Sequence, residues 1–168
     1  RKLFEIVKSL QQQDIELTVE KNRLILKTSN STFKLSILPA NNFPTFEKHK
    51  SIEAFTIIQT QLLDLLNKTS FSMATNPDVR FILCGLLLEI KPNKITAVAT
   101  DAHRLAISSS VLEKKQINNI SCIVPRKAVL ELIRVLQGDT ETKVSIGTNQ
   151  ISVNTKNVSF VSKLMDGK

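Results

Sequence analysis

Apolar and polar positions follow the same pattern in two separated stretches of the chain. The segments RKLFEIVKSLQ (1–11) and KAVLELIRVLQ (127–137) place apolar side chains at the spacing of an amphipathic helix. Each is followed by alternating segments, IELTVEKNRLILKT (15–28) and TKVSIGTNQISVNT (142–155), which are typical of strands. An asparagine near the middle of each strand segment indicates a turn. The pattern predicts a helix followed by strands, twice.

The two stretches also match position by position. The helical segments align at an offset of 126 residues, which pairs Leu3 with Val129. After a slip of one residue, the strand segments align without a gap and pair Leu17 with Val144. Chance similarity between two helix–hairpin units is the alternative, but a gapless run of matched core positions favours duplication. Because each copy is cut off at one side, we expect both ends of the chain to lie inside domains.

The segment between the two copies contains further elements. It begins with a polar, turn-rich stretch at 39–50 that we interpret as an interdomain linker. The strand at Ile52–Thr56 precedes a helix at Thr60–Thr69, for which Thr60 is the expected N-cap. Strands are then predicted at Phe81–Ile90, Ile95–Ala99 and Leu105–Ser109, with a turn at Lys91–Lys94. This order favours an α+β fold over a doubly wound sheet.

Composition places the chain among ordinary globular proteins with a basic surplus. Hydrophobic residues make up 42% and charged residues 23%, and no apolar run approaches the ~18 residues of a membrane span. The net charge is +8, which favours a polyanionic partner such as nucleic acid. Solvated lysine-rich loops are the alternative source of this charge. Cys84 and Cys122 lie among apolar neighbours and are expected to be buried free thiols in a cytoplasmic protein.

The predicted outward faces of the two repeated helices carry similar charges. Lys127, Glu131 and Arg134 share one face of the second helix, whose apolar face is expected to consist of Val129, Leu130, Leu132, Ile133 and Leu136. The first helix has Arg1, Glu5 and Lys8 at the matching positions. One interpretation is a solvated face stabilised by ion pairs. The other is a helix that meets the phosphates of duplex DNA without reading its sequence, since the chain has no Trp or Tyr for base stacking.

One motif identifies a family. The segment VATDAHRLA at 98–106 resembles the Thr-Asp-Gly-His-Arg-Leu-Ala signature of bacterial sliding clamps, the β subunits of DNA polymerase III. The resemblance covers essentially the whole chain, and further similar segments occur in the same order. They are LPA with FP at 38–44, FSMA at 71–74, DVR at 78–80, VPRK at 124–127, and SKL with DG at 162–167.

The resemblance implies an architecture and a function. Clamp subunits have three domains of one α+β fold, and two subunits form a ring with helices lining the channel and antiparallel sheets outside. Residues 1–47 would be the second half of the N-terminal domain, 48–50 a linker, and 51–168 the middle domain without its last strands. We therefore expect an internal fragment of a processivity factor that encircles DNA. Its implied partners are double-stranded DNA, the polymerase III catalytic subunit, the clamp loader, other clamp-motif proteins and a second copy of itself.

The resemblance also implies a peptide-binding site. The family has a hydrophobic pocket that takes short linear motifs of polymerases, the clamp loader and repair proteins, with its remaining residues downstream of Lys168. Ala102 stands where the family has glycine, so a positive φ there would be strained. The pocket positions are Leu83, Thr100, Ala102, His103, Arg104 and Leu105.

Two further surfaces follow from the same resemblance. The expected subunit interface consists of Phe33, Leu35 and Lys2. Ile82 departs from the aromatic residues that the family often has at a DNA-contacting position. The full set of positions expected to contact DNA is Arg1, Lys2, Lys8, Arg80, Phe81, Ile82, Arg126, Lys127 and Arg134.

An enzymatic function is the main alternative. On a strand, Asp101 and His103 would share one face, where a carboxylate can orient a general base. However, the sequence shows no partner nucleophile, glycine-rich phosphate loop, or acidic cluster for Mg²⁺, and His49 and His103 lie far from both cysteines. We therefore predict no catalytic residue, metal or cofactor. A nuclease or transferase subunit, or an interaction module with incidental charge, remain the competing interpretations.

Overall fold

The computed structural model describes residues 1–10, 14–43, 52–76, 80–112 and 118–166. The chain divides into two compact units, unit 1 at Arg1–Glu47 and unit 2 at Lys48–Lys168. The expected linker at 48–50 lies outside the described residues, as do Asp78, Val79 and Gly167 of the family-like segments.

The described part of unit 1 contains one α-helix and a three-stranded antiparallel sheet. Helix α1 (Lys2–Ser9) is followed by β1 (Glu16–Glu20), β2 (Arg23–Lys27) and β3 (Thr32–Ser36), which pair in the order β1-β2-β3. The turn between β1 and β2 contains Lys21, at a φ of 53°, and Asn22, as the sequence predicts. A short 3-10 helix, η1 (Ala40–Asn42), lies in the turn-rich stretch at 39–50, within the part of it that the structure describes.

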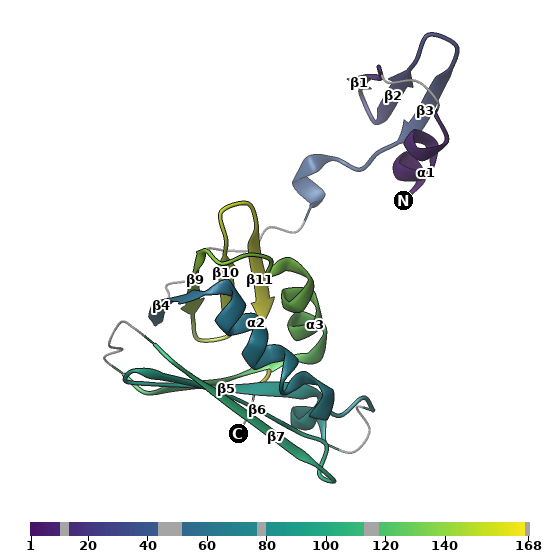
Figure 1. The fold of residues 1–168 in the computed structure, drawn as a ribbon. Coiled ribbons are helices and arrows are strands. Elements are labelled where there is room, and N and C mark those ends of the chain that lie inside the picture. Colours follow the sequence, from purple (N-terminus) through teal and green to yellow (C-terminus); the bar gives the residue numbers. More distant parts are fainter. Residues whose placement is uncertain (11–13, 44–51, 77–79, 113–117, 167–168) are drawn as a thin grey trace. The chain divides into compact units, whose positions relative to one another are not determined.

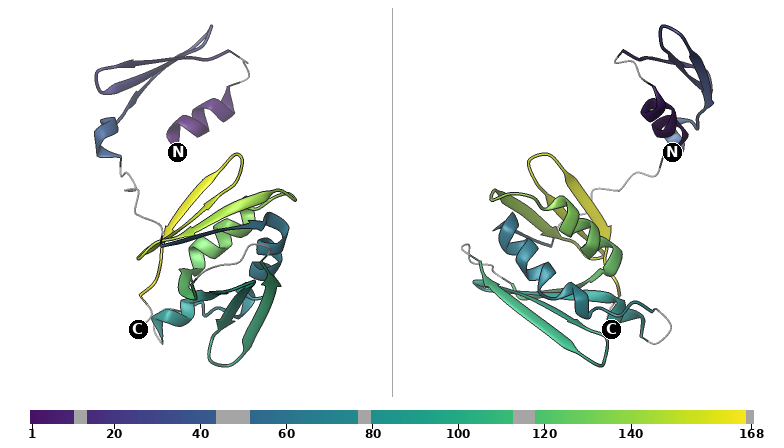
Figure 2. Two further views of the ribbon diagram at one scale, coloured as in Figure 1. Left: turned by 90° about the vertical axis from the view of Figure 1, so that its left-hand side faces the viewer. Right: turned by 45° about the vertical axis from the view of Figure 1, so that its right-hand side comes forward.

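Unit 2 contains two four-stranded antiparallel sheets and two helices (Figure 1). One sheet has the order β11-β10-β9-β4 and the other the order β7-β6-β5-β8. Helices α2 and α3 pack against each other between the two sheets, and β11 contacts β8 where the sheets meet (Figure 2). The elements are β4 (Glu53–Ile58), α2 (Gln59–Asn67), η2 (Ser70–Ser72), η3 (Phe81–Cys84), β5 (Gly85–Lys91), β6 (Lys94–Thr100), β7 (Leu105–Val111), β8 (Ile120–Pro125), α3 (Arg126–Val135), β9 (Glu141–Ile146), β10 (Gln150–Asn154) and β11 (Ser159–Lys163).

The core of unit 2 forms where the helices meet the inner faces of the sheets. Leu65 and Leu66 of α2 and Val129 and Leu132 of α3 are all at most 2% exposed. Each such side chain contributes roughly 1.5–3 kcal/mol through removal of apolar surface from water. Alternating residues of the strands, including Ile90, complete the core from the sheets. The α+β prediction is confirmed.

The register of the strands supports the predicted duplication. In unit 1, Leu17 pairs with Leu26, and Leu26 pairs in turn with Phe33. In unit 2, Val144 pairs with Val153, and Val153 pairs with Phe160, which are the positions 127 residues later. Because a shift of one residue would move every side chain to the other face, identical registers mean that matching residues of the two copies lie on the same face of their sheets.

Several local predictions need correction. The strand predicted at Phe81–Ile90 begins only at Gly85, because residues 81–84 form η3. Helix α2 begins at Gln59 with Ile58 as its N-cap, and the Thr60 hydroxyl instead donates to Asp139 Oδ1 at 2.9 Å. The helix ends at Asn67 rather than Thr69.

Burial of the apolar positions differs in part from the prediction for α3. Leu130 is exposed, whereas Ala128 takes a place in the core. In β4, which begins one residue later than predicted, Phe55 and Ile57 are the buried residues.

Candidate functional site

The motif at 98–106 forms the end of β6, a tight turn and the start of β7. The Thr100 hydroxyl donates to the Arg104 carbonyl at 2.7 Å and accepts the Ala102 N–H at 3.1 Å. Asp101 Oδ1 accepts the N–H groups of His103 at 3.1 Å and Arg104 at 3.0 Å. Two short polar side chains therefore satisfy the backbone of the turn and present His103 and Leu105 to solvent.

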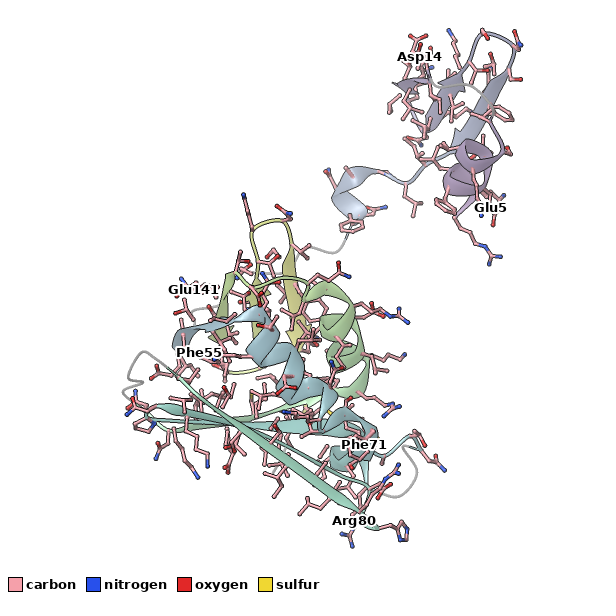
Figure 3. The ribbon with its side chains drawn as sticks, viewed as in Figure 1. Glu5, Asp14, Phe55, Phe71, Arg80 and Glu141 are labelled. Carbon is pink, nitrogen blue, oxygen red and sulfur yellow. The ribbon has the colours of Figure 1, made fainter. Side chains whose placement is uncertain are left out.

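Arg104 ties this turn to a second segment of unit 2. Its Nε lies 3.2 Å from Asp101 Oδ2, and its Nη2 donates to the Phe71 carbonyl at 3.0 Å. The guanidinium carbon also lies 5.9 Å from the centroid of the Phe71 ring, within the range of a cation–π contact. The turn is thus braced against η2, where Phe71 lies (Figure 3).

The prediction that Asp101 and His103 would share a strand face is wrong. Both residues lie in the turn, and the Asp101 carboxylate accepts backbone N–H groups and pairs with Arg104. The N–H of His103, followed by that of Arg104, lowers the pKa of the Asp101 carboxyl below its ordinary value. A carboxylate held in its ionised form by the main chain organises the turn, which is a structural role.

Ala102 adopts a φ of 75°, in the left-handed region that favours glycine. For an L-residue this conformation costs about 1–2 kcal/mol. Glycine would remove that cost, but its greater conformational entropy in the unfolded state cancels about 0.5–1 kcal/mol of the stabilisation. We therefore expect Ala102→Gly to raise the free energy of unfolding by about 0.5–1 kcal/mol in urea denaturation. The matched control is Ala54→Gly in β4, a strand position at which glycine should destabilise. If both substitutions destabilised the protein, the strain at residue 102 would be disproved.

An apolar hollow of about 180 Å³ opens beside this turn. Leu83 and Thr100 are the members of the predicted pocket that line it, and Ala102, His103, Arg104 and Leu105 follow Thr100 in the adjoining turn. Leu105 is 60% exposed at the start of β7. The described residues that line it are Ile82, Leu83, Gly85, Leu87, Val98, Ala99, Thr100 and Ile123.

Sequence reasoning missed most of this lining. Leu87, Val98 and Ile123 form one cross-strand row, because Leu87 pairs with Val98 on one side and with Ile123 on the other. Their outward orientation was encoded in the alternation of β5 and β6, but the pairing of β5 with the distant β8 was not. Ile82, which is predicted to contact DNA, also lines the hollow. The signal that was available is the apolar outward face of β5 and β6.

A larger and more open hollow, of about 1020 Å³, lies on unit 1. It is formed around the β1–β2 turn and β3, and charged residues such as Glu20, Arg23 and Lys34 contribute to its walls. No residue of the pocket motif lines it. Its size alone does not make it a binding site, because a specific site needs an enclosed apolar surface with a few directed polar groups.

The predicted basic face of α3 is exposed to solvent. Lys127, Glu131 and Arg134 are all exposed, and Arg134 Nη1 lies 3.2 Å from Glu131 Oε1. Arg126 is half-buried, and its Nη1 donates to the Met73 carbonyl at 3.4 Å. The side chains of α3 that point away from the sheets are drawn in Figure 3.

Helix α1 and β3 carry the predicted residues of unit 1. Lys2 and Lys8 are exposed on α1, and Arg1 Nε lies 3.0 Å from Glu5 Oε1. In β3, Phe33 and Leu35 are half-buried and alternate with exposed residues. In unit 2, Arg80 and Phe81 are exposed just before the residues that line the hollow.

The two cysteines differ in exposure, contrary to the prediction that both are buried. Cys122 is buried, which raises the pKa of its thiol to about 12, whereas Cys84 is half-exposed. Because the thiolate is the nucleophile, we expect iodoacetamide at mildly alkaline pH to alkylate Cys84 and spare Cys122 in the folded protein. Peptide mapping by mass spectrometry measures this, with urea-unfolded protein as the control in which both react. Equal alkylation of both cysteines in the folded protein would contradict the expectation.

Two absences complete the description of the site. Among the residues that the structure describes, no group of three His, Cys, Asp or Glu side chains is placed to hold a metal ion. No helix in the described ranges is long and apolar enough to cross a membrane.

The geometry and the sequence agree with one family. Residues 56–168 match the family described as DNA polymerase III beta subunit, central domain, and residues 1–47 match the corresponding N-terminal domain. The chain therefore belongs to the DNA polymerase III beta subunit family. The match to the central domain includes the turn, the hollow and α3.

Individual relatives are similar along the whole chain. The beta sliding clamp of Pseudomonas aeruginosa is 43% identical over 170 residues, which is 100% of this chain and 46% of the relative. The crystal structure of DNA polymerase III subunit beta from the same organism matches 99% of the chain with a TM-score of 0.90 and 42% identity, over 46% of its own length. A further P. aeruginosa clamp structure, bound to griselimycin, gives a TM-score of 0.89 at 43% identity, again over 99% of this chain and 46% of that one. The chain thus spans about half the length of these relatives.

Proposed function

We propose that this chain acts as part of a sliding clamp, the processivity factor of the bacterial replicative DNA polymerase. The observation that carries the proposal is the braced turn at 100–105 beside an apolar hollow, in a chain of the beta subunit family. An apolar hollow with a polar, well-ordered rim is suited to the anchor side chain of a short peptide. The docked partners would be the polymerase III catalytic subunit, the clamp loader and repair proteins that carry a clamp motif.

Binding to duplex DNA is the second part of the proposal. The exposed cations of α3 and α1 are suited to phosphate contacts, which carry no sequence information. Arg80 and Phe81 would add contacts at the pocket end of unit 2. In the assembled clamp, helices of successive domains would line the channel around DNA, and the β3 residues Phe33 and Leu35, with Lys2, would meet a second subunit.

In this function the chain itself has no catalytic residue. The nucleotidyltransferase reaction would belong to the polymerase complex that the clamp joins, in the bacterial cytoplasm. The structure offers no support for the competing enzyme interpretation at Asp101, because its carboxylate is engaged by the main chain. An interaction module with incidental charge would bind peptide without a salt-dependent affinity for DNA.

The proposal is tested by measuring two independent binding reactions. A fluorescein-labelled clamp-motif peptide should bind the protein, and griselimycin, which a solved relative binds, should displace it. A linear duplex should bind more weakly as salt rises, and its binding should be unaffected by the peptide. For encirclement, full-length protein loaded by its clamp loader should be retained on circular DNA and lost once the circle is cut. Equal retention on circular and linear DNA would refute encirclement.

A further inference from the structure

Gly85 occupies a position in unit 2 at which no side chain fits without rearrangement. It is the first residue of β5, pairs with Pro125 of β8, and lines the hollow. A Cβ at this position would overlap Ile123 Cγ2, lie 2.7 Å from Met165 Sδ and lie 3.0 Å from the Val124 carbonyl oxygen. Its φ is not in the left-handed region, so the constraint is one of space and not of backbone conformation.

The side chains that close over Gly85 also shape the hollow. Ile123, on the edge strand β8, is one of the residues that line it. Met165 follows β11, and its N–H donates to the Ile123 carbonyl at 2.9 Å, which fixes it beside β8. Ile123 both adjoins the Cβ position of residue 85 and lines the hollow, so a displacement of its side chain changes the shape of the hollow.

The size of the hollow matches one apolar side chain. A cavity of about 150 Å³ lined by apolar residues accepts benzene. The hollow here measures about 180 Å³, and Thr100 is the one lining residue with a polar side chain. A leucine or phenylalanine anchor would fill this space, whereas an alanine anchor would leave most of it empty.

We propose that Gly85 is a specificity-determining residue of the peptide site, because the missing side chain keeps Ile123 out of the hollow. The inference rests on the proposed peptide-binding function. A methyl group at residue 85 displaces Ile123 into the space of the anchor, and the hollow then accepts only smaller side chains. Removal of Ile123 Cγ2, as in Ile123→Ala, relieves the overlap and has the opposite effect on the hollow.

The test uses clamp-motif peptides that differ only in the anchor, which is alanine, valine, leucine or phenylalanine. Fluorescence anisotropy with the purified protein gives the dissociation constants. Gly85→Ala is expected to weaken the leucine and phenylalanine peptides about tenfold or more, and the alanine peptide less than about twofold. Adding Ile123→Ala to Gly85→Ala should restore much of the loss, because it removes the overlapping Cγ2. Ser121→Ala, on the same face of β8 but outside the hollow, is the matched control.

The outcomes separate this inference from the proposed function. If the unsubstituted protein does not prefer leucine and phenylalanine anchors over alanine, the proposed peptide site itself fails. If the unsubstituted protein does prefer these anchors, but Gly85→Ala weakens the binding of all four peptides equally or of none, the role of Gly85 is refuted. Should Gly85→Ala fail to fold by circular dichroism, Ile123→Ala decides in its place. That substitution should shift preference toward phenylalanine, and an unchanged order of affinities would overturn the inference.

Discussion

Replacing Lys127 and Arg134 together by alanine is expected to reduce the salt dependence of DNA binding. Each phosphate contact contributes about 0.9 to the slope of log K against log salt, so the slope should fall by about 1.8. The affinity lost between about 50 and about 200 mM salt would then shrink by roughly tenfold. The Arg134–Glu131 ion pair does not prevent this, since exposed pairs are worth only about 0–1 kcal/mol and yield to a phosphate.

The matched control removes the same charge from the outer side of a sheet. Lys91 and Lys94 flank the β5–β6 turn, and Lys91 pairs with Glu89 at 3.3 Å much as Arg134 pairs with Glu131. Lys91→Ala with Lys94→Ala lowers the net charge equally but should leave the slope within about 0.3 of the unsubstituted value. Titration of a labelled duplex at several salt concentrations measures both variants. If the two double variants changed the slope alike, net charge would explain DNA binding and α3 would lose its assigned role.

Local periodicity was sufficient to predict most elements of this fold. The alternation of apolar and polar residues in β1, β2, β9 and β10 is a property of each segment alone, so it could be recognised without the fold. The matching registers show that this alternation was interpreted correctly. Residues 81–90 were different, because the segment is almost uniformly apolar and offers no period from which to locate a break. The 3-10 helix η3 at Phe81–Cys84 was missed for that reason.

Burial was less predictable than secondary structure, because it depends on what other segments supply. Leu17 in β1 is 54% exposed, whereas its equivalent in β9, Val144, is 1% exposed. Unit 2 places both α-helices and a second sheet against its repeat, whereas α1 is the one α-helix beside the three strands in the described part of unit 1. Two sequences with the same pattern and the same register therefore bury very different amounts of apolar surface.

The candidate site also has one part that neighbouring residues determine and another that depends on distant segments. The motif located the turn at 100–105, since Thr100 and Asp101 act on backbone groups within four residues. The walls of the hollow include residues of β5 and β6, which form a hairpin, and Ile123 of β8, which pairs with β5 across 30 to 40 residues of sequence. Gly85 and Ile123 gave no signal on their own, because their importance arises only where the two strands meet.

Leu105→Ala is expected to weaken binding of the clamp-motif peptide about tenfold or more while DNA binding stays unchanged. Truncation of an apolar anchor residue in a binding site commonly costs about 2 kcal/mol, whereas phosphate contacts do not involve this side chain. Ile107→Ala is a close control, because Ile107 lies two residues further on the same face of β7 and is 61% exposed, against 60% for Leu105. Because the two side chains are equally exposed and lie on the same face of β7, a loss of peptide binding in Leu105→Ala alone would reflect the proximity of Leu105 to the turn and the hollow. Equal losses in the two variants would instead describe a broad apolar face along β7, and equal losses for peptide and DNA would remove Leu105 from the peptide site.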